Sequence, residues 1–203
     1  VNVVRSVADA VSVPLIVWGC GDDDKDNMVM PPIAEAIKGK NALLGTVTEG
    51  NYKTLVAACQ MGGHNLIGES PLDINIGKQV NILVSDSGFP LDRVVMYPTT
   101  GALGYGIEYA YSIMERGRLA ALSGDKMMST PVVCRVGPEV FRVKEAKAPL
   151  EEQPHWGALE ERGPMWEAMT ASTLLMGGAD IMLMRHPKSV KIIKNMINEL
   201  MEK

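Results

Sequence analysis

The chain has 203 residues, of which 46% are hydrophobic and 22% are charged. This balance is typical of a folded globular protein, and the length is sufficient to bury a full core. The net charge of −4 offers no basic surface for nucleic acid, and no apolar run approaches the roughly 20 residues of a membrane span. We therefore expect neither nucleic-acid binding nor membrane insertion.

Short apolar segments alternate with segments of helical pattern along the chain. Residues 1–12 resemble a helix, and predicted strands follow at 13–19, 41–47, 64–70, 92–98, 130–137 and 179–187. Helices are predicted between these strands and after the last one, and Gly39 and Gly88 mark helix ends. Ser70, followed by Pro71, is predicted to cap the next helix. Strict alternation of strand and helix predicts parallel strands with right-handed crossovers, and hence an α/β fold.

Two α/β architectures fit this alternation: an open doubly wound sheet and a TIM (β/α)8 barrel. No GxGxxG motif follows the first strand, and the helix at 107–121 has one apolar face. We favour the barrel. Because about six βα units are present and the chain begins within a helix, we expect residues 1–203 to form one barrel domain that lacks its N-terminal part.

Residues 139–164 interrupt the alternation with a charged, proline-containing stretch after the fifth predicted strand. Long loops inside compact domains are usually functional or interaction segments. A loop insertion of this kind is expected here, either as a functional segment or as a tolerated surface insertion.

The cysteines do not form a metal or disulfide pattern. The three are Cys20, Cys59 and Cys134, and no CxxC pair occurs. An odd and scattered set is typical of reduced thiols in a cytoplasmic protein, so we expect no iron–sulfur cluster in this chain. Of the histidines, only His186 follows a predicted strand, and His64, at the start of a strand, is interpreted as structural. Metal catalysis is not expected.

In either architecture, ligands bind at the carboxyl ends of the strands. Asn51 and Glu69 lie at two such ends, and Glu69 can serve either in ligand contact or in a local hydrogen bond. Arg185 and His186 form a cationic strand end, which can meet a ligand or close an ion pair. The acidic run 22–24 is interpreted as a solvated loop with a helix cap.

The most unusual strand end is the stretch 96–111, MYPTTGALGYGIEYAY. It lacks the lysine of a P-loop and the glycine order of a dinucleotide motif. Its glycines allow another surface to approach the backbone closely. A mouth rich in glycine and hydroxyl groups but poor in acid–base pairs predicts binding of a large, flat or protein-borne ligand.

Several long segments together resemble one known family. They are Gly68–Leu83 (GESPLDINIGKQVNIL), Tyr97–Met127 (beginning YPTTGALGYGIEYAY), Leu159–Ala168 (LEERGPMWEA) and Gly178–Pro187 (GADIMLMRHP). The chain resembles the C-terminal portion of the small (delta) subunit of the corrinoid iron–sulfur protein, part of the CO dehydrogenase/acetyl-CoA synthase system. The resemblance extends from about Val13 onward.

The resemblance implies a TIM barrel that pairs with a large (gamma) subunit carrying a [4Fe–4S] cluster and a corrinoid. It further implies methyl transfer from a methyltetrahydropterin, through a methyltransferase and the corrinoid, to acetyl-CoA synthase. The corrinoid would lie at the barrel mouth. The residues we expect to face it are Thr99, Thr100, Gly101, Gly104 and Tyr105, with Glu69, Asn51, Arg185 and His186 as second choices.

Two alternatives remain open from the sequence. The chain could be an independent methyltetrahydropterin:corrinoid methyltransferase of the related pterin-binding barrels, in which Asn51 and Glu69 would bind the pterin. It could also be a purely structural partner whose mouth touches neither ligand. We expect a non-autonomous, cytoplasmic subunit.

Overall fold

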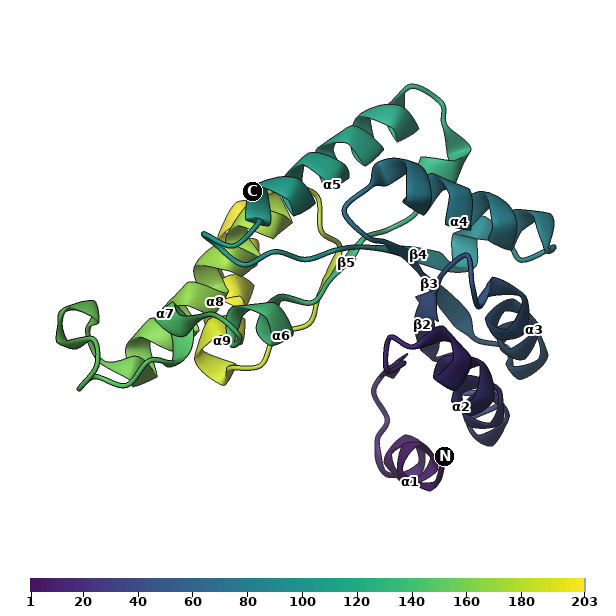
Figure 1. Cartoon of the computed structure of the whole chain (residues 1–203), viewed down its shortest axis with the longest axis horizontal. Coiled ribbons are helices and arrows are strands. Elements are labelled where there is room, and N and C mark those ends of the chain that lie inside the picture. The colour runs from purple at the N-terminus through teal and green to yellow at the C-terminus, as the bar shows by residue number, and fades with distance from the viewer. Residues whose placement is uncertain (203) are drawn as a thin grey trace. The chain divides into compact units, whose positions relative to one another are not determined.

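In the computed structural model, residues 1–202 are described, and the chain divides into two compact units. The first comprises Val1–Tyr97 and Leu119–Pro131, and the second comprises Pro98–Arg118 and the chain from Val132 onward. Figure 1 shows the elements of both units in chain order. Six strands occur among the described residues, each followed by a helix, which confirms the predicted alternation.

The first unit holds a sheet of order β1-β2-β3-β4. Its elements are α1 (Asn2–Ala10), β1 (Ile16–Trp18), α2 (Asp23–Ala36), β2 (Leu43–Val47), α3 (Tyr52–Gly62), β3 (Asn65–Ser70), α4 (Ile74–Asp86), η1 (Leu91–Arg93), β4 (Val94–Pro98) and η2 (Lys126–Met128). The pairs β1–β2 and β2–β3 are parallel, with Ile16 opposite Leu43 and Leu43 opposite Asn65.

The core of the first unit lies between this sheet and helices α2, α3 and α4, which lie beside one another in Figure 1. Leu44 of β2 and Leu66 of β3 are at most 1% exposed, and Val80 of α4 packs in the same cluster. Burying a side chain of this size stabilises a fold by about 1.5–3 kcal/mol. The β2 and β3 sequences are almost continuously apolar because both faces of a parallel sheet are covered.

His64 belongs to this core, as its position at the start of a strand predicted. It is completely buried; its Nδ1 accepts the Ala42 N–H at 3.2 Å, and its Nε2 lies 2.9 Å from the Ala34 carbonyl oxygen. The ring joins the end of α2 to the entry of β2, so the structural interpretation of His64 is confirmed.

Aspartates cap helices α2 and α4 of the first unit. Asp22 caps α2 by accepting the Lys25 N–H at 2.9 Å, as expected for the acidic run. The prediction that Ser70 caps the next helix is wrong, because α4 begins at Ile74 with Asp73 as its cap. Ser70 is still part of β3, and its hydroxyl donates to the Asp73 carbonyl oxygen instead.

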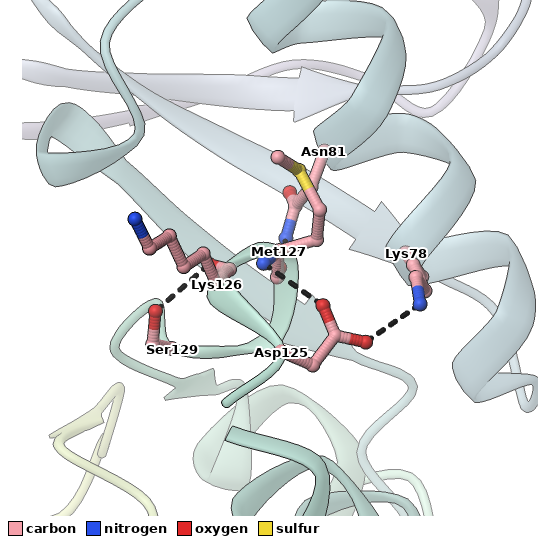
Figure 2. Close-up of polar contacts among 6 residues, drawn as sticks. All are labelled: Lys78, Asn81, Asp125, Lys126, Met127 and Ser129. Carbon is pink, nitrogen blue, oxygen red and sulfur yellow. Dashed lines mark hydrogen bonds and ion pairs between the residues drawn. The ribbon is translucent and has the colours of Figure 1, made fainter. Parts of the chain in front are cut away.

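A polar clamp fixes the segment around η2 to α4 (Figure 2). Lys78 Nζ lies 2.6 Å from Asp125 Oδ2, and Asn81 Nδ2 donates to the Met127 carbonyl oxygen at 2.7 Å. Asp125 also caps η2 by accepting the Met127 N–H. These contacts hold the residues just before Pro131, whose carbonyl oxygen accepts the Met96 N–H of β4.

The second unit contains the shorter parallel pair β5–β6, in which Val133 lies opposite Ile181. Its elements are α5 (Ile107–Leu122, whose last turn belongs to the first unit), β5 (Val133–Cys134), α6 (Val136–Val140), α7 (Lys144–Lys147), η3 (Pro154–Trp156), α8 (Leu159–Met176), β6 (Ile181–Met182) and α9 (Pro187–Met201). Helices α6, α7 and α9 pack against α8.

The expected insertion 139–164 contains α7, η3 and the first turns of α8. Arg162 anchors it: Nη1 donates to the Gly157 carbonyl oxygen at 3.0 Å, and the guanidinium also donates to the carbonyl oxygens of Glu145 and Ala148. The functional role of this segment stays a prediction. Across residues 1–202, none of the helices combines the length and apolar character that crossing a membrane requires.

Candidate functional site

The carboxyl ends of β1, β2 and β3 surround an acidic hollow of about 430 Å³ in the first unit. It is lined by Gly21, Asp22, Asp23, Asp24, Thr46, Thr48 and Glu69. The lining comes from the β1–α2 loop, the end of β2 and the end of β3, because parallel strands bring their carboxyl ends to one edge. Four of the lining side chains are carboxylic acids and none is a cation.

Asn51 organises the wall of this hollow. Its buried amide donates from Nδ2 to Asp23 Oδ1 at 3.1 Å and to the Thr46 carbonyl oxygen at 3.0 Å. Its Oδ1 accepts the Thr48 N–H at 2.9 Å. These bonds use both amide hydrogens and one acceptor position, so Asn51 holds the loop after β2 in place.

Glu69 was expected either to contact a ligand or to make a local hydrogen bond. The structure shows the local bond: the Thr46 hydroxyl donates to Glu69 Oε2 at 2.5 Å. The Glu69 side chain is half-buried and also lines the hollow. Its carboxylate has further acceptor positions, so the bond to Thr46 fixes its orientation without saturating it.

Asp26 is a structural residue of this edge that the sequence interpretation missed. It is 3% exposed, and its carboxylate accepts the N–H of Cys20 at 2.9 Å and the N–H of Gly21 at 3.2 Å. The sequence did contain a sign of this role, because Asp26 lies one helical turn beyond Asp22, the residue that caps α2. Its charge is stabilised by backbone amides, which accounts for a buried carboxylate without a cation.

The glycine-rich stretch forms a tight loop between β4 and α5, and residues 99–106 of this loop belong to the second unit. A Cβ on Gly101 would lie 2.3 Å from the Gly106 carbonyl carbon, so only glycine allows the two ends of the loop to approach. Gly104 has φ +78°, and among the described residues no heavy atom beyond its own residue and its two chain neighbours lies within 4 Å of its Cβ position. The loop therefore presents bare backbone on one side.

Two hydroxyl groups of this loop, those of Thr100 and Tyr105, have different hydrogen-bond partners. Thr100 is buried, and its Oγ1 accepts the Arg135 N–H at 2.9 Å, which ties the loop to the residue after β5. Thr99 is half-buried. Tyr105 is 47% exposed, and its hydroxyl donates to Glu145 Oε2 of α7 at 2.8 Å.

The strand end after β6 is held by a second residue that sequence interpretation missed, Glu167 of α8. This fully buried carboxylate accepts the Arg185 N–H at 2.6 Å and the His186 N–H at 3.0 Å. His186 is the N-cap of α9, and its Nδ1 accepts the Lys188 N–H. A glutamate inside an apolar helix was the available signal, but its partners lie far along the chain.

The predicted site residues therefore divide between the two units. Asn51 and Glu69 lie at the acidic hollow of the first unit, whereas Thr99, Thr100, Gly101, Gly104, Tyr105, Arg185 and His186 lie in the second. Among residues 1–202 no group of three or more histidine, cysteine or acidic side chains has the arrangement of a metal site. Burial raises the pKa of Cys59 and that of Cys134 to about 12, so both thiols stay protonated at neutral pH.

Two solved structures are similar to the chain in fold. Dihydropteroate synthase from Yersinia pestis aligns with a TM-score of 0.60 at 14% identity, covering 99% of this chain and 74% of that structure. The Xanthomonas albilineans enzyme aligns with a TM-score of 0.63 at 12% identity, covering 99% and 73%. Both are TIM barrels, so the predicted fold class is confirmed as an α/β fold corresponding to part of a TIM barrel.

Sequence comparisons identify the family. The delta subunit of the acetyl-CoA decarbonylase/synthase complex from Archaeoglobus fulgidus is 36% identical over 98% of this chain and 45% of its own length. The corresponding Methanopyrus kandleri subunit is 37% identical over 98% and 49%. The chain thus spans about half the length of the curated relatives it matches. The family described as CO dehydrogenase/acetyl-CoA synthase delta subunit matches residues 1–137, and the chain belongs to this family.

Proposed function

We propose that the chain is a non-autonomous part of a delta subunit that caps a corrinoid held by a partner subunit. In this role it takes part in methyl transfer between a methyltetrahydropterin and acetyl-CoA synthase. The observation that carries the proposal is the bare backbone at Gly104, in a chain whose family is that of the delta subunits. The bound corrinoid would supply the cobalt chemistry, and the chain would supply a fitted, water-excluding surface.

The glycine-rich loop suits a broad, flat group. A macrocycle needs a surface without projecting side chains, and the open space at the Cβ position of Gly104 meets that need. Gly101 keeps the loop closed, and Thr100 anchors it through Arg135. Loop 99–106 would thus meet the corrinoid with backbone amides and carbonyls, and Tyr105 would lie at its rim.

The remaining candidates would act less directly. Asn51 and Glu69 have local hydrogen-bond partners, and Glu167 holds the backbone of Arg185 and His186. Their proposed part is to shape the strand ends, with the exposed Arg185 side chain free to reach a carboxamide or a partner carboxylate.

The partner would be the large subunit, with its own iron–sulfur cluster. An iron–sulfur cluster needs several cysteine thiolates brought together, and among residues 1–202 no group of three or more cysteine, histidine or acidic side chains has such an arrangement. The proposal therefore places the cluster outside this chain. The methyltransferase and acetyl-CoA synthase would act on the same corrinoid from further subunits.

The test is to co-express the chain with the large subunit and to measure bound corrinoid by its visible spectrum. Gly104→Leu places a bulky side chain in the open space and is expected to lower corrinoid retention at least tenfold. Gly39→Leu is the matched control: Gly39 has φ +81°, equally open space, and lies at the amino end of β2. If the folded complex of the Gly104→Leu chain with the large subunit retains the corrinoid, only a structural role remains for this subunit.

The acidic hollow supports a second candidate, an independent methyltetrahydropterin:corrinoid methyltransferase. Carboxylates at a strand end can accept the N–H groups of a pterin ring, and Glu69 has acceptor capacity to spare. Calorimetry of the isolated chain with a methyltetrahydropterin tests this candidate. It predicts binding that Glu69→Ala abolishes, whereas the capping function predicts no heat of binding.

Asn51→Ala needs a stability control in the same experiment. Because Asn51 makes three local hydrogen bonds, its loss is expected to destabilise the fold by about 2–3 kcal/mol whether or not pterin binds. Asn75→Ala, at an exposed position of α4, is the matched control and should leave the stability unchanged.

A further inference from the structure

A second hollow of about 430 Å³ lies beside the glycine-rich loop, wholly within the second unit. It is lined by Ala102, Tyr105, Glu139, Arg142, Val143 and Lys144. Its volume falls within the roughly 300–1,000 Å³ of small-molecule sites. Its walls come from loop 99–106 and from residues 139–144, which run from the end of α6 to the start of α7. These two parts of the chain are about 40 residues apart, and the Tyr105–Glu145 hydrogen bond joins them.

The charge of this hollow is opposite to that of the chain. Its lining carries two cations, Arg142 and Lys144, and one carboxylate, Glu139, which leaves one positive charge (2 − 1 = +1). The chain as a whole carries −4, and the equally large hollow of the first unit is lined by four carboxylic acids. A positive hollow in an acidic protein attracts anions selectively.

Both cations have donors available. Arg142 bonds the Glu139 carboxylate through Nη1 alone, at 3.1 and 3.2 Å, so its Nε and Nη2 donors remain for a ligand. The pair is exposed on the arginine side and contributes little to stability. The Lys144 ammonium lies 5.8 Å from the centre of the Trp156 ring and has no carboxylate partner among residues 1–202.

The other walls are apolar. The side chains of Ala102 and Val143 are buried, and the exposed ring of Tyr105 forms a third surface. The hydroxyl of Tyr105 is directed to Glu145, so the ring meets the hollow as a neutral aromatic surface. Apolar walls with a few polar groups at fixed positions are the usual composition of small-molecule sites.

We propose that this hollow binds a small organic anion, whose carboxylate, sulfonate or phosphate group contacts Arg142 and Lys144 and whose apolar part lies against Val143 and Tyr105. The site requires neither a corrinoid nor a partner subunit, so it goes beyond the capping function and can be tested without it. An inorganic ion lacks the apolar part and a neutral aromatic molecule lacks the charge, so each is expected to bind more weakly than a ligand that has both.

The probe is the fluorescent aromatic sulfonate 8-anilinonaphthalene-1-sulfonate, titrated into the 203-residue chain. The variant Arg142→Gln/Lys144→Gln is expected to weaken its binding at least tenfold, because charge-assisted hydrogen bonds to the sulfonate are lost. The neutral analogue N-phenyl-1-naphthylamine should bind the variant and the parent chain equally. The matched control is Lys191→Gln/Lys194→Gln, which removes two exposed cations from α9 and should change neither titration.

Circular dichroism checks that each variant is folded, and the single charge reversal Lys144→Glu provides an independent test at an exposed position. Lys144→Glu should weaken the binding of the sulfonate probe more than Lys144→Gln does. Equal sulfonate binding by the parent chain and the Arg142→Gln/Lys144→Gln variant would overturn the proposal. An equal loss in the α9 control would do the same, since it would show that general charge and not this hollow governs binding.

Discussion

The hydroxyl of Tyr105 donates a hydrogen bond of 2.8 Å to the Glu145 carboxylate, and this bond joins the glycine-rich loop to α7. It raises the pKa of Tyr105 above its ordinary value, because ionising the phenol removes the donated hydrogen and places a second negative charge beside Glu145. The contact connects the two segments that line the positive hollow.

Glu145→Ala is therefore expected to lower the pKa of Tyr105 toward the ordinary value of about 10. Ultraviolet difference titration against Tyr105→Phe isolates this phenol, and Tyr109→Phe, at another exposed tyrosine, is the control. Because the folded pKa is raised, the stability from this bond is present below the unfolded pKa and is lost as the pH rises through the folded one. An unchanged Tyr105 titration in Glu145→Ala would mean that the bond does not form in solution.

Glu167→Gln tests the buried carboxylate of α8. A glutamine has one acceptor oxygen, so one of the two N–H groups of Arg185 and His186 would face an amide donor. Leaving a buried N–H unpaired costs about 1–3 kcal/mol, and we expect that loss in the free energy of unfolding by urea. Glu160→Gln, at an exposed position in the first turn of the same helix, should stay within about 0.5 kcal/mol of the parent.

The clamp of Figure 2 predicts an acid-dependent contribution to stability. The Lys78 ammonium, through its hydrogen bond, lowers the pKa of Asp125 below the ordinary value. A lowered pKa means that the stabilisation is present above the unfolded pKa, about 4, and disappears as the pH falls through the folded value.

Urea midpoints of the parent and Lys78→Gln should therefore differ at neutral pH and converge in acid. Lys53→Gln, at another lysine of the first unit, should have a urea midpoint close to that of the parent both at neutral pH and in acid. A difference between parent and Lys78→Gln that stays constant down to about pH 2 would show that the clamp acts through packing and not through the Asp125 charge.

Thiol labelling provides a test of burial. Cys20 is exposed, whereas Cys59 and Cys134 are buried with their pKa raised to about 12 by desolvation. A thiolate-specific reagent at mildly alkaline pH should label one cysteine of the folded chain and all three after denaturation. Cys20→Ser should abolish the fast labelling, and rapid reaction of a second thiol in the folded chain would contradict the described core.

Local sequence patterns predicted where the strands lie but not where all of them end: β5 and β6 have two residues each, and Val136 and Gly137 of the fifth predicted strand belong to α6. All six strands lie within the predicted apolar runs between helical segments, and the strand–helix alternation predicted the parallel pairs and the α/β class. The role of His64 also followed from its position at a strand start. The cap of α4 did not, because Ser70 and Asp73 are both good caps and the choice between them depends on where β3 ends.

The sequence by itself determined the α/β class and the family, because periodicity, glycine placement and long shared segments are properties of the chain order. It also predicted the strand ends as the place of a site. The tertiary structure decided which polar groups meet: Asp26 with the amides after β1, Glu167 with the strand end before α9, and Tyr105 with Glu145. Those partners lie from about 5 to 40 residues apart along the chain. A charge or hydrogen bond acts over a few ångströms of space, so only the folded backbone could show which hollow is acidic and which is positive.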